Sequence, residues 1–265
     1  MAELVIVGGG KMGEALLGGL LDSGWSAANI VVVEPIETRR RELEETHGVS
    51  TSAAVVKGEG MILATKPDVI ASVAAAAAEV GAGRLLSIAA GVSTATIDQA
   101  VGNSDSPGPL PVIRAMPNTA ALVGQGACAI APNAHASDDD LDWAESILGA
   151  VGRVVRVSEG ALDAVTGLSG SGPAYVFLVA EAMIEAGVLA GLERPIASEL
   201  AIQTLLGAAT LLAQGRPPAE LRADVTSPGG TTAAGLRALE EHGVRFAFLS
   251  AVEAATSRSR ELGQA

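Results

Sequence analysis

The sequence has very little cysteine and histidine. Cys128 is the single cysteine in 265 residues, and the three histidines, His47, His135 and His242, are far apart in the chain. A lone cysteine cannot form an internal disulfide, and scattered histidines do not make the ligand clusters that zinc requires. We therefore expect no metal site and a location in the cytoplasm.

Basic and aromatic side chains are also scarce. The chain has 17 Lys and Arg against 30 Asp and Glu, a formal net charge of −13, and 2% aromatic residues. Proteins that bind nucleic acids need a basic face and usually aromatic rings that stack on bases, and anionic membrane surfaces also attract basic proteins. We therefore expect no nucleic acid and no membrane as a partner.

Long apolar segments are missing as well. The first apolar run, Leu4–Val7, is too short for the core of a signal peptide. Further on, Ala74–Ala78 ends at a glutamate, and Ile202–Leu212 contains several polar residues. Because a membrane-spanning helix needs about 20 consecutive apolar residues, the sequence predicts none.

What the chain does contain is 49% hydrophobic residues, which is typical of a globular interior and not of a disordered chain. In the first half, short apolar runs alternate with segments of helical composition. This alternation predicts a doubly wound α/β domain whose mostly parallel sheet is covered on both faces. The expected strands are Glu3–Val7, Ile30–Glu34, Gly60–Thr65, Arg84–Ala89, Val112–Ala115, Ala127–Ala131 and Arg153–Val157, and the expected helices between them are Lys11–Ser23, Ile36–His47, Asp68–Val80 and Ser137–Leu148.

After Val157 the strand-like runs stop, so we place a domain boundary near Ser158, with an α/β domain over residues 1–158 and an all-helical domain over 159–265. Apolar residues occupy nearly every side of the segments Tyr175–Leu189 and Leu200–Leu212. Helices that are hydrophobic all round must be buried on all sides, and a domain of this size has little interior. A subunit interface is therefore expected to cover part of them. The five expected helices are Pro173–Ala190, Pro195–Gln214, Pro217–Ala223, Thr231–His242 and Val244–Leu262.

A glycine-rich turn follows the first expected strand and opens the first expected helix. Its sequence, Gly8-Gly9-Gly10-Lys11-Met12-Gly13, matches the G-x-G-x-x-G pattern of dinucleotide-binding proteins. Gly8 would allow the tight turn, Gly10 would let the backbone approach a pyrophosphate, and Gly13 would allow close packing of helix on strand. Since the chain has 32 glycines, a turn without a ligand is the alternative interpretation.

The charged residues after the second strand leave the type of dinucleotide open. Glu34 lies 21 residues after Gly13, where an acidic residue accepts hydrogen bonds from the adenosine ribose and disfavours a 2′-phosphate. The arginines at 39–41 could instead hold that phosphate, or they could form a solvated helix face with the neighbouring glutamates. Both NADH and NADPH therefore remain possible cofactors.

Two further loops follow strands at the edge where ligands bind in such sheets. The first is Ala64-Thr65-Lys66-Pro67, in which Lys66 could face the pyrophosphate or the nicotinamide, or could be a surface lysine. The second, Ser87-Ile88-Ala89-Ala90-Gly91, is built from residues small enough for a flat ring to lie against the backbone, although ordinary close packing would also explain it.

In the helical part, the turn Ser227-Pro228-Gly229-Gly230-Thr231-Thr232 precedes an expected helix. Free N–H groups and two hydroxyls at a helix start suit a carboxylate, and a simple helix N-cap is the alternative. The three lysines all lie in the first domain, so the second offers no lysine base. A dehydrogenase acting on an alcohol needs such a base, whereas a reductase of a protonated cyclic imine mainly needs orientation of its substrate.

Several long motifs resemble those of the pyrroline-5-carboxylate reductase family, NAD(P)H enzymes that make L-proline. They occur in the order of the family and extend over nearly the whole chain. The motifs are Arg114-Ala115-Met116-Pro117-Asn118-Thr119, the stretch Leu162 to Tyr175 (LDAVTGLSGSGPAY), Asp224 to Thr232 (DVTSPGGTT) and Ala251 to Thr256 (AVEAAT).

The resemblance implies a Rossmann domain followed by an all-helical domain that forms a homodimer, with dimers assembled into a decamer. It also implies an active site between the cofactor and the helical domain of the partner. The implied cofactor-binding residues are Gly8, Gly10, Lys11, Met12 and Gly13 at the pyrophosphate, and Ala64, Thr65, Lys66, Pro67, Ala89, Ala90, Gly91, Met116, Pro117 and Asn118 toward the nicotinamide. The implied substrate-binding residues are Glu159, Ser227, Gly229, Gly230, Thr231 and Thr232.

Thr232 is expected to act in catalysis, because its hydroxyl would hydrogen-bond the ring nitrogen and relay a proton. Two departures from the family limit the transfer. Glu34 stands where many members have a small hydroxyl residue, which puts a strict preference for NADPH in doubt. Ala53 stands where an Asn commonly contacts the adenosine ribose, and Asp224 stands where another amide is found in some members, so those cofactor contacts are not carried over.

We therefore expect NAD(P)H-dependent hydride transfer to the C=N bond of 1-pyrroline-5-carboxylate, giving L-proline in the last step of proline biosynthesis. A β-hydroxyacid-dehydrogenase-like oxidoreductase is the second interpretation, which the missing lysine of the second domain disfavours. The third is a nucleotide-sensing module without enzyme activity, which the residues of the substrate turn disfavour.

Overall fold

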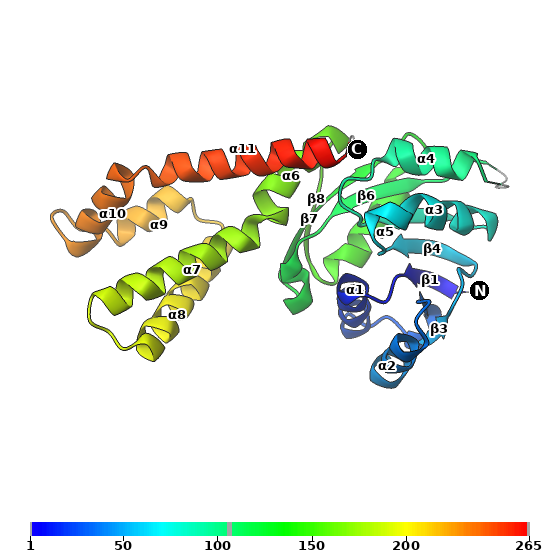
Figure 1. Cartoon of the computed structure of the whole chain (residues 1–265), viewed down its shortest axis with the longest axis horizontal. Coiled ribbons are helices and arrows are strands. Elements are labelled where there is room, and N and C mark those ends of the chain that lie inside the picture. The colour runs from blue at the N-terminus through cyan, green and yellow to red at the C-terminus, as the bar shows by residue number, and fades with distance from the viewer. Residues whose placement is uncertain (1, 105–107, 264–265) are drawn as a thin grey trace. The chain divides into compact units, whose positions relative to one another are not determined.

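The computed structural model describes residues 2–104 and 108–263. They form an eight-stranded sheet with helices on both faces, followed by a group of long helices (Figure 1). The strands are β1 (Ala2–Val7), β2 (Ile30–Val33), β3 (Ser50–Ser52), β4 (Gly58–Leu63), β5 (Arg84–Ser87), β6 (Val112–Met116), β7 (Gly126–Pro132) and β8 (Gly152–Arg156). The α-helices are α1 (Lys11–Asp22), α2 (Glu37–His47), α3 (Ile70–Glu79), α4 (Thr94–Gly102), α5 (Asp138–Gly149), α6 (Leu162–Val165), α7 (Gly172–Leu189), α8 (Arg194–Ala213), α9 (Pro218–Asp224), α10 (Thr231–Glu241) and α11 (Val244–Leu262).

The sheet has the strand order β3-β2-β1-β4-β5-β6-β7-β8. Neighbouring strands among those described run parallel, except that β6 and β7 are antiparallel. The predicted α/β fold with a mostly parallel sheet and a following helical region is confirmed. Three of these elements were not predicted: β3, whose Ser-Thr-Ser sequence lacks apolar residues, α4, which begins after the N-cap Ser93, and the short α6.

The two apolar layers of the sheet follow from the alternation of side chains along each strand. In β1, Leu4 and Ile6 belong to the cluster that also includes residues of α1, α2 and α5. Val5 and Val7 belong to the cluster with residues of α3 and α4. Because both faces are covered, a continuous apolar run is needed, and these four side chains are at most 3% exposed.

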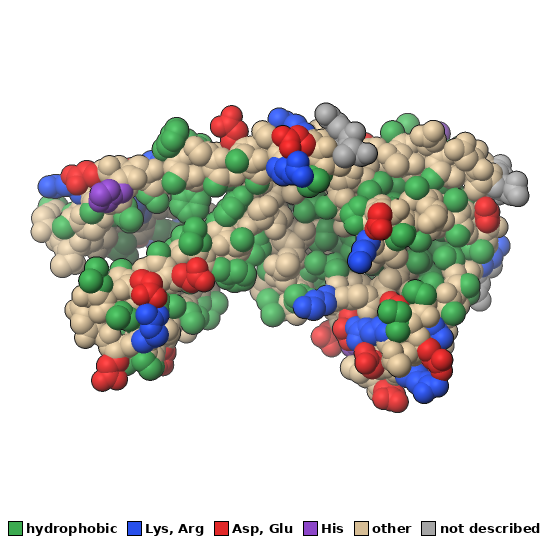
Figure 2. Space-filling model, in the orientation of Figure 1, with side chains coloured by type: hydrophobic (Ala, Val, Ile, Leu, Met, Phe, Trp, Pro, Cys, Tyr) green, Lys and Arg blue, Asp and Glu red, His purple; other side chains and the backbone are tan. Residues whose placement is uncertain are grey.

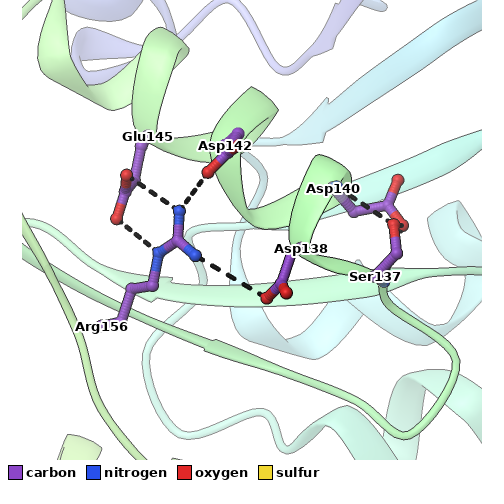
Figure 3. A network of polar contacts seen from close by, with 6 residues as sticks. All are labelled: Ser137, Asp138, Asp140, Asp142, Glu145 and Arg156. Atoms are coloured by element: carbon purple, nitrogen blue, oxygen red, sulfur yellow. Dashed lines mark hydrogen bonds and ion pairs between the residues drawn. The ribbon is translucent and has the colours of Figure 1, made fainter.

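Helix α5 shows how a helix of the sheet unit closes its own N-terminus (Figure 3). The Ser137 hydroxyl accepts a hydrogen bond from the Asp140 N–H at 3.3 Å, and the Asp140 carboxylate accepts one from the Ser137 N–H at 2.9 Å. This capping box satisfies two donors that the helix cannot satisfy itself. Arg156 of β8 then joins the helix to the strand by pairing with Asp142 and Glu145.

The chain divides into two compact units. Unit 1 contains the described residues up to Ser171 together with those from Glu253 onward, and unit 2 is Gly172–Val252. The predicted boundary near Ser158 therefore differs from this division in two places. The segment after Ser158 stays with the sheet because Leu162 packs on Ala129 and Ala131 of β7, and the end of α11 returns to unit 1.

Unit 2 consists of α7 to α10 and the first part of α11. None of the described residues of α7 is buried, and in α8 only Ala197 and Ala201 are. Large apolar side chains such as Phe177, 65% exposed, and Leu206, 59% exposed, face solvent in the single chain. Figure 2 shows hydrophobic side chains exposed along these helices.

The helical stretches Glu159–Leu189 and Arg194–Ala213 are long and apolar enough to cross a membrane by length and composition alone. The apolar runs of the sequence predict no such segment, because polar residues interrupt them. Mean hydropathy over a window of 18 residues tolerates those interruptions.

Candidate active site

The glycine-rich turn lies between β1 and α1, and packing requires two of its three predicted glycines. Gly8 has φ +115°, and a Cβ on it would lie 2.5 Å from the Ala64 carbonyl oxygen. A Cβ on Gly13 would lie 2.1 Å from the Gly8 carbonyl oxygen. These two positions therefore exclude any side chain through packing.

Gly10 differs from them because nothing lies within 4 Å of where its Cβ would be. It is the N-cap of α1 and makes no side-chain cap with a described residue. The N-terminus of α1 thus presents backbone donors and a partial positive charge toward open space. Lys11 begins the helix and is exposed, and it forms no ion pair with another residue in the described ranges, while Met12 follows it in the first turn.

Glu34 immediately follows β2 and is 8% exposed. Its Oε2 accepts a hydrogen bond from the Gly9 N–H at 3.1 Å, and its Oε1 accepts one from the Ile36 N–H at 3.0 Å. Arg39 donates from Nε to the Gly9 carbonyl at 2.8 Å, so the glycine turn is held from both sides. The sequence placed Glu34 near a ribose, but it could not show that its carboxylate also fixes the turn.

The loop after β4 packs against the glycine turn. A Cβ on Gly8 would lie 3.2 Å from Thr65 Cγ2, and the Ala64 N–H donates to the Val7 carbonyl at 2.8 Å. Lys66 is exposed and precedes a short helical turn that begins at Pro67; it has no ion-pair partner among the residues that the structure describes.

Two buried hydroxyls near these loops have no hydrogen-bond partner within the described part of the chain. They are Thr65 Oγ1 and Ser87 Oγ, and they follow or end two neighbouring strands, β4 and β5. Buried polar groups are nearly always paired, so unpaired ones at a ligand-binding edge are consistent with a partner supplied from outside the chain.

The loop after β5 lines a cleft of about 750 Å³ within unit 1. Ala89 is buried, Ala90 is exposed, and Gly91 adopts φ +76°. Residues of the predicted cofactor loops and of the LDAVTGLSGSGPAY motif meet in its wall. The lining includes Pro67, Ala90, Gly91, Thr166, Ser171 and Ser259. The structure thus brings the second and third predicted loops together with the family motif.

The segment Met116-Pro117-Asn118 is held by the same motif. Asn118 donates from Nδ2 to the Ser169 carbonyl at 3.0 Å, and its Oδ1 accepts the Ala127 N–H at 3.2 Å. A Cβ on Gly170 would lie 2.7 Å from Met116 Cε. Residues Thr166–Gly170 form a π-helical turn, a feature that is frequent at functional sites.

Glu159 joins three parts of unit 1. Its carboxylate accepts hydrogen bonds from the Thr94 N–H at 2.7 Å, the Thr94 hydroxyl at 2.6 Å and Arg114 at 3.3 Å. Burial acts to raise the pKa of Glu159, but the hydrogen bonds from Thr94 and Arg114 outweigh it and hold the pKa below its usual value. The sequence places Arg114 in a family motif but does not pair Thr94 or Arg114 with Glu159, because these partners lie 65 and 45 residues away in the chain.

The predicted substrate turn, Ser227–Thr232, lies in unit 2, so it belongs to a different unit from Glu159. Gly229 adopts φ +72°, and a Cβ on Gly230 would lie 2.4 Å from Ser227 Oγ. Gly230 is the N-cap of α10, and no described side chain caps this helix. The threonines thus do not make the simple N-cap that was the alternative interpretation, and the first N–H groups of α10 remain as donors.

The residues present fit a dinucleotide. The glycine turn offers an uncapped helix N-terminus over open space, and Thr65 and Ser87 offer unpaired hydroxyls at the same edge of the sheet. Thiol chemistry is not favoured, since burial raises the pKa of Cys128 to about 12. Residues 2–104 and 108–263 contain no group of three His, Cys, Asp or Glu side chains that could hold a metal ion.

Two sequence models of protein families match the chain. The one described as pyrroline-5-carboxylate reductase dimerisation matches residues 159–262. The other, described as NADP oxidoreductase, coenzyme F420-dependent, matches residues 3–91.

Curated relatives match over almost their full length. A pyrroline-5-carboxylate reductase of Synechocystis is 47% identical over 270 residues, covering 99% of this chain and 98% of the relative. One from Methanosarcina acetivorans is 44% identical, with the same shares covered.

Solved structures agree with this likeness. A pyrroline-5-carboxylate reductase from Coxiella burnetii superimposes with a TM-score of 0.92 at 34% identity and 98% coverage of both chains. The Plasmodium falciparum pyrroline carboxylate reductase with NADP bound gives a TM-score of 0.83 at 28% identity, covering 99% of this chain and 98% of the other. With the motifs, the fold and these full-length matches together, the chain belongs to the pyrroline-5-carboxylate reductase family.

Proposed function

We propose that this protein uses NAD(P)H to reduce the C=N bond of 1-pyrroline-5-carboxylate, giving L-proline. The observation that carries the proposal is the presence, in one chain of this family, of two uncapped helix N-termini behind glycine turns. One, at α1, suits a pyrophosphate, and the other, at α10, suits a carboxylate. The function is that of an oxidoreductase in amino-acid biosynthesis.

The substrate carboxylate would be held by the turn Ser227–Thr232. Gly229 adopts a positive φ and Gly230 packs against Ser227, and the backbone N–H groups and the hydroxyls of Ser227, Thr231 and Thr232 would face one ligand. Neither threonine hydroxyl forms a hydrogen bond with another residue that the structure describes, so both remain available. Thr232 would hydrogen-bond the ring nitrogen and relay a proton to it as the amine forms.

The cofactor would be held by backbone more than by charged side chains. Gly8, Gly10, Lys11, Met12 and Gly13 would bind the pyrophosphate. The segments 64–67, 89–91 and 116–118 would line the nicotinamide end, with Asn118 acting through the backbone that it holds in place. When bound, the nicotinamide supplies the hydride that the C=N carbon accepts.

Glu159 is proposed as a residue that contacts the substrate, supported by its place in the family motif. Its carboxylate oxygens already accept three hydrogen bonds from Thr94 and Arg114, which orient it and keep it ionised. An ionised carboxylate in this position would favour a protonated imine nitrogen over a neutral one.

The apolar surface of α7 and α8 is proposed to be covered by a second copy of the chain and not by lipid. The dimerisation model covers all of unit 2, which supports a homodimer formed through the helical domain. Five such dimers would make the decamer that the resemblance implies, and the active site would combine the cofactor of one subunit with the helical domain of its partner. A cytoplasmic location follows from the same proposal.

The direct test is oxidation of NADH and NADPH by the purified protein with 1-pyrroline-5-carboxylate, beside a 3-hydroxy acid assayed in the oxidative direction. Turnover is expected with the imine and not with the hydroxy acid. Turnover of the hydroxy acid would favour the β-hydroxyacid-dehydrogenase interpretation, and cofactor binding without turnover of either would favour a sensing module.

Thr232→Ala tests the assigned proton relay. Loss of one orienting hydrogen bond should lower kcat/KM roughly 5- to 150-fold, which corresponds to a loss of transition-state stabilisation of about 1–3 kcal/mol. Thr232→Ser keeps the hydroxyl and should retain most activity. Full kcat/KM in Thr232→Ala would remove this residue from the mechanism.

A further inference from the structure

We infer that this protein uses NADH in preference to NADPH, and that Glu34 determines the preference. The inference rests on the proposed dinucleotide site at Gly8–Gly13. The sequence alone leaves the preference open, because Glu34 favours NADH while the arginines at 39–41 could favour NADPH. The structure shows how all of these side chains are engaged.

The first observation is the position of the Glu34 carboxylate. It is 8% exposed and is fixed by the N–H groups of Gly9 and Ile36, at 3.1 and 3.0 Å. Gly9 lies inside the glycine turn, so a negative charge stands next to the predicted cofactor path. In a buried position, repulsion between this carboxylate and a 2′-phosphate is weakly screened.

The second observation concerns the N-terminus of α2. A helix start behind the second strand is where free N–H groups could take a phosphate. Here the N-cap is Ile36, whose N–H already donates to Glu34, and the first turn carries the acidic Glu37. The site that would attract a 2′-phosphate is therefore occupied by one carboxylate and flanked by another.

The third observation is that each arginine of the run has other partners. Arg39 donates to the Gly9 carbonyl and pairs with Glu14 and Glu42. The hydrogen bond that Arg39 donates to Glu14 is the main cause that raises the pKa of Arg39 above its usual value. Arg41 pairs with Glu37.

Arg40 is the remaining arginine of the run, and it contacts backbone carbonyls instead of carboxylates. It donates from one guanidinium nitrogen to the carbonyls of Glu34 and Pro35, at 2.8 and 2.9 Å. These bonds hold the backbone that carries the Glu34 carboxylate. Arg40 therefore supports the acidic residue where it stands, and the lone pairs of Glu34 that remain can accept a ribose hydroxyl.

The test measures dissociation constants of NADH and NADPH for the full-length protein by titration of cofactor fluorescence, together with kcat/KM for each. The wild-type protein should bind NADH at least tenfold more tightly. Glu34→Gln keeps the size of the side chain and one acceptor but removes the charge, and it should shift the ratio at least tenfold toward NADPH. Arg41→Ala is the matched control and should leave the ratio unchanged.

Three results would overturn the inference: tighter binding of NADPH by the wild-type protein, an unchanged ratio in Glu34→Gln, or a selective loss of NADPH binding in Arg40→Ala. The wild-type ratio decides even if a variant does not fold. Binding of neither cofactor would instead overturn the proposed function, so the two failures are distinguishable.

Discussion

The two units of this protein bury their apolar side chains in different ways. In unit 1, strands such as β1 place alternate side chains in two layers that helices of the same chain cover completely. In unit 2, α7 is also rich in apolar residues, yet none of its described residues is buried. The difference teaches that unit 1 is complete within one chain, whereas unit 2 has the composition of an interior whose other half must come from elsewhere.

The helix N-termini show a parallel contrast. Helix α5 closes its N-terminus with the capping box of Ser137 and Asp140, while α1 and α10 begin at glycines without a side-chain cap from any described residue. The capping box of α5 engages the Asp140 N–H, so this helix start has fewer free donors for a ligand. The uncapped starts of α1 and α10 lie behind glycine turns, and these are the positions proposed for the cofactor and the substrate.

The largest effect is expected from breaking the contrast in burial. Phe177→Asp or Leu206→Asp should convert the proposed dimer to a monomer at micromolar concentration. Each apolar side chain buried at an interface contributes about 1.5–3 kcal/mol, the loss occurs in both subunits, and a buried unpaired carboxylate adds to it. Sedimentation equilibrium measures the result.

Val155→Asp is the control for these variants, because Val155 is a comparably exposed apolar residue of unit 1. It should leave the association state unchanged. A wild-type protein that sediments as a monomer would mean that unit 2 does not need a second copy.

A smaller effect is expected at the glycine turn, where two glycines should respond oppositely. Gly13→Ala places a Cβ against the Gly8 carbonyl and should lower the free energy of unfolding by about 3 kcal/mol. Gly10→Ala meets no protein atom, so it should retain stability but weaken cofactor binding. Denaturant unfolding and cofactor titration separate the two, and equal stability of both variants would contradict the packing argument.

Glu159→Gln should lower the free energy of unfolding by about 1–2 kcal/mol, because the nearly buried Arg114 loses its charged partner while Thr94 keeps an acceptor. Since the folded-state pKa of Glu159 is lowered, its contribution is fully present above the pKa of about 4.3 in the unfolded chain and is lost as the pH falls through the lower folded value.

Denaturant unfolding between neutral pH and pH 3 measures this difference. The stability of wild type and Glu159→Gln should converge as the medium becomes acidic. A raised KM without any change in stability would instead assign Glu159 to the substrate alone.

The smallest effect sharpens the contrast between helix starts. Ser137→Ala removes the cap of α5 and should lower the free energy of unfolding by about 1 kcal/mol. Ser146→Ala in the same helix removes a hydroxyl that donates to the Trp143 carbonyl and should change it by less than 0.5 kcal/mol. Equal effects of the two variants would show that the capping box has no special role.

Local pattern was sufficient to predict most strands and helices, because apolar periodicity and turn residues act over short distances. It missed β3, whose residues Ser50–Ser52 are polar and form a strand only by pairing with β2. The glycine turn and the turn before α10 were predicted from their motifs, and the structure supplies the packing reasons.

The remaining parts of the site depend on contacts between distant residues. The bonds of Asn118 to Ser169, of Glu159 to Thr94 and of Gly9 to Glu34 each join segments at least 25 residues apart. No local pattern encodes such pairs, because they arise only when the sheet brings the ends of different strands to one edge. The return of α11 to unit 1 was missed for the same reason.

That return makes the helical unit an insertion. The chain leaves unit 1 after Ser171 and re-enters it at Glu253, and Ser259 there donates to Asp163 at 2.7 Å. A protein cut after residue 158 would thus lose the segments that line the 750 Å³ cleft from the C-terminal side. Because both ends of the insertion are tethered, a change at its proposed dimer surface can strain unit 1 through two covalent connections at once.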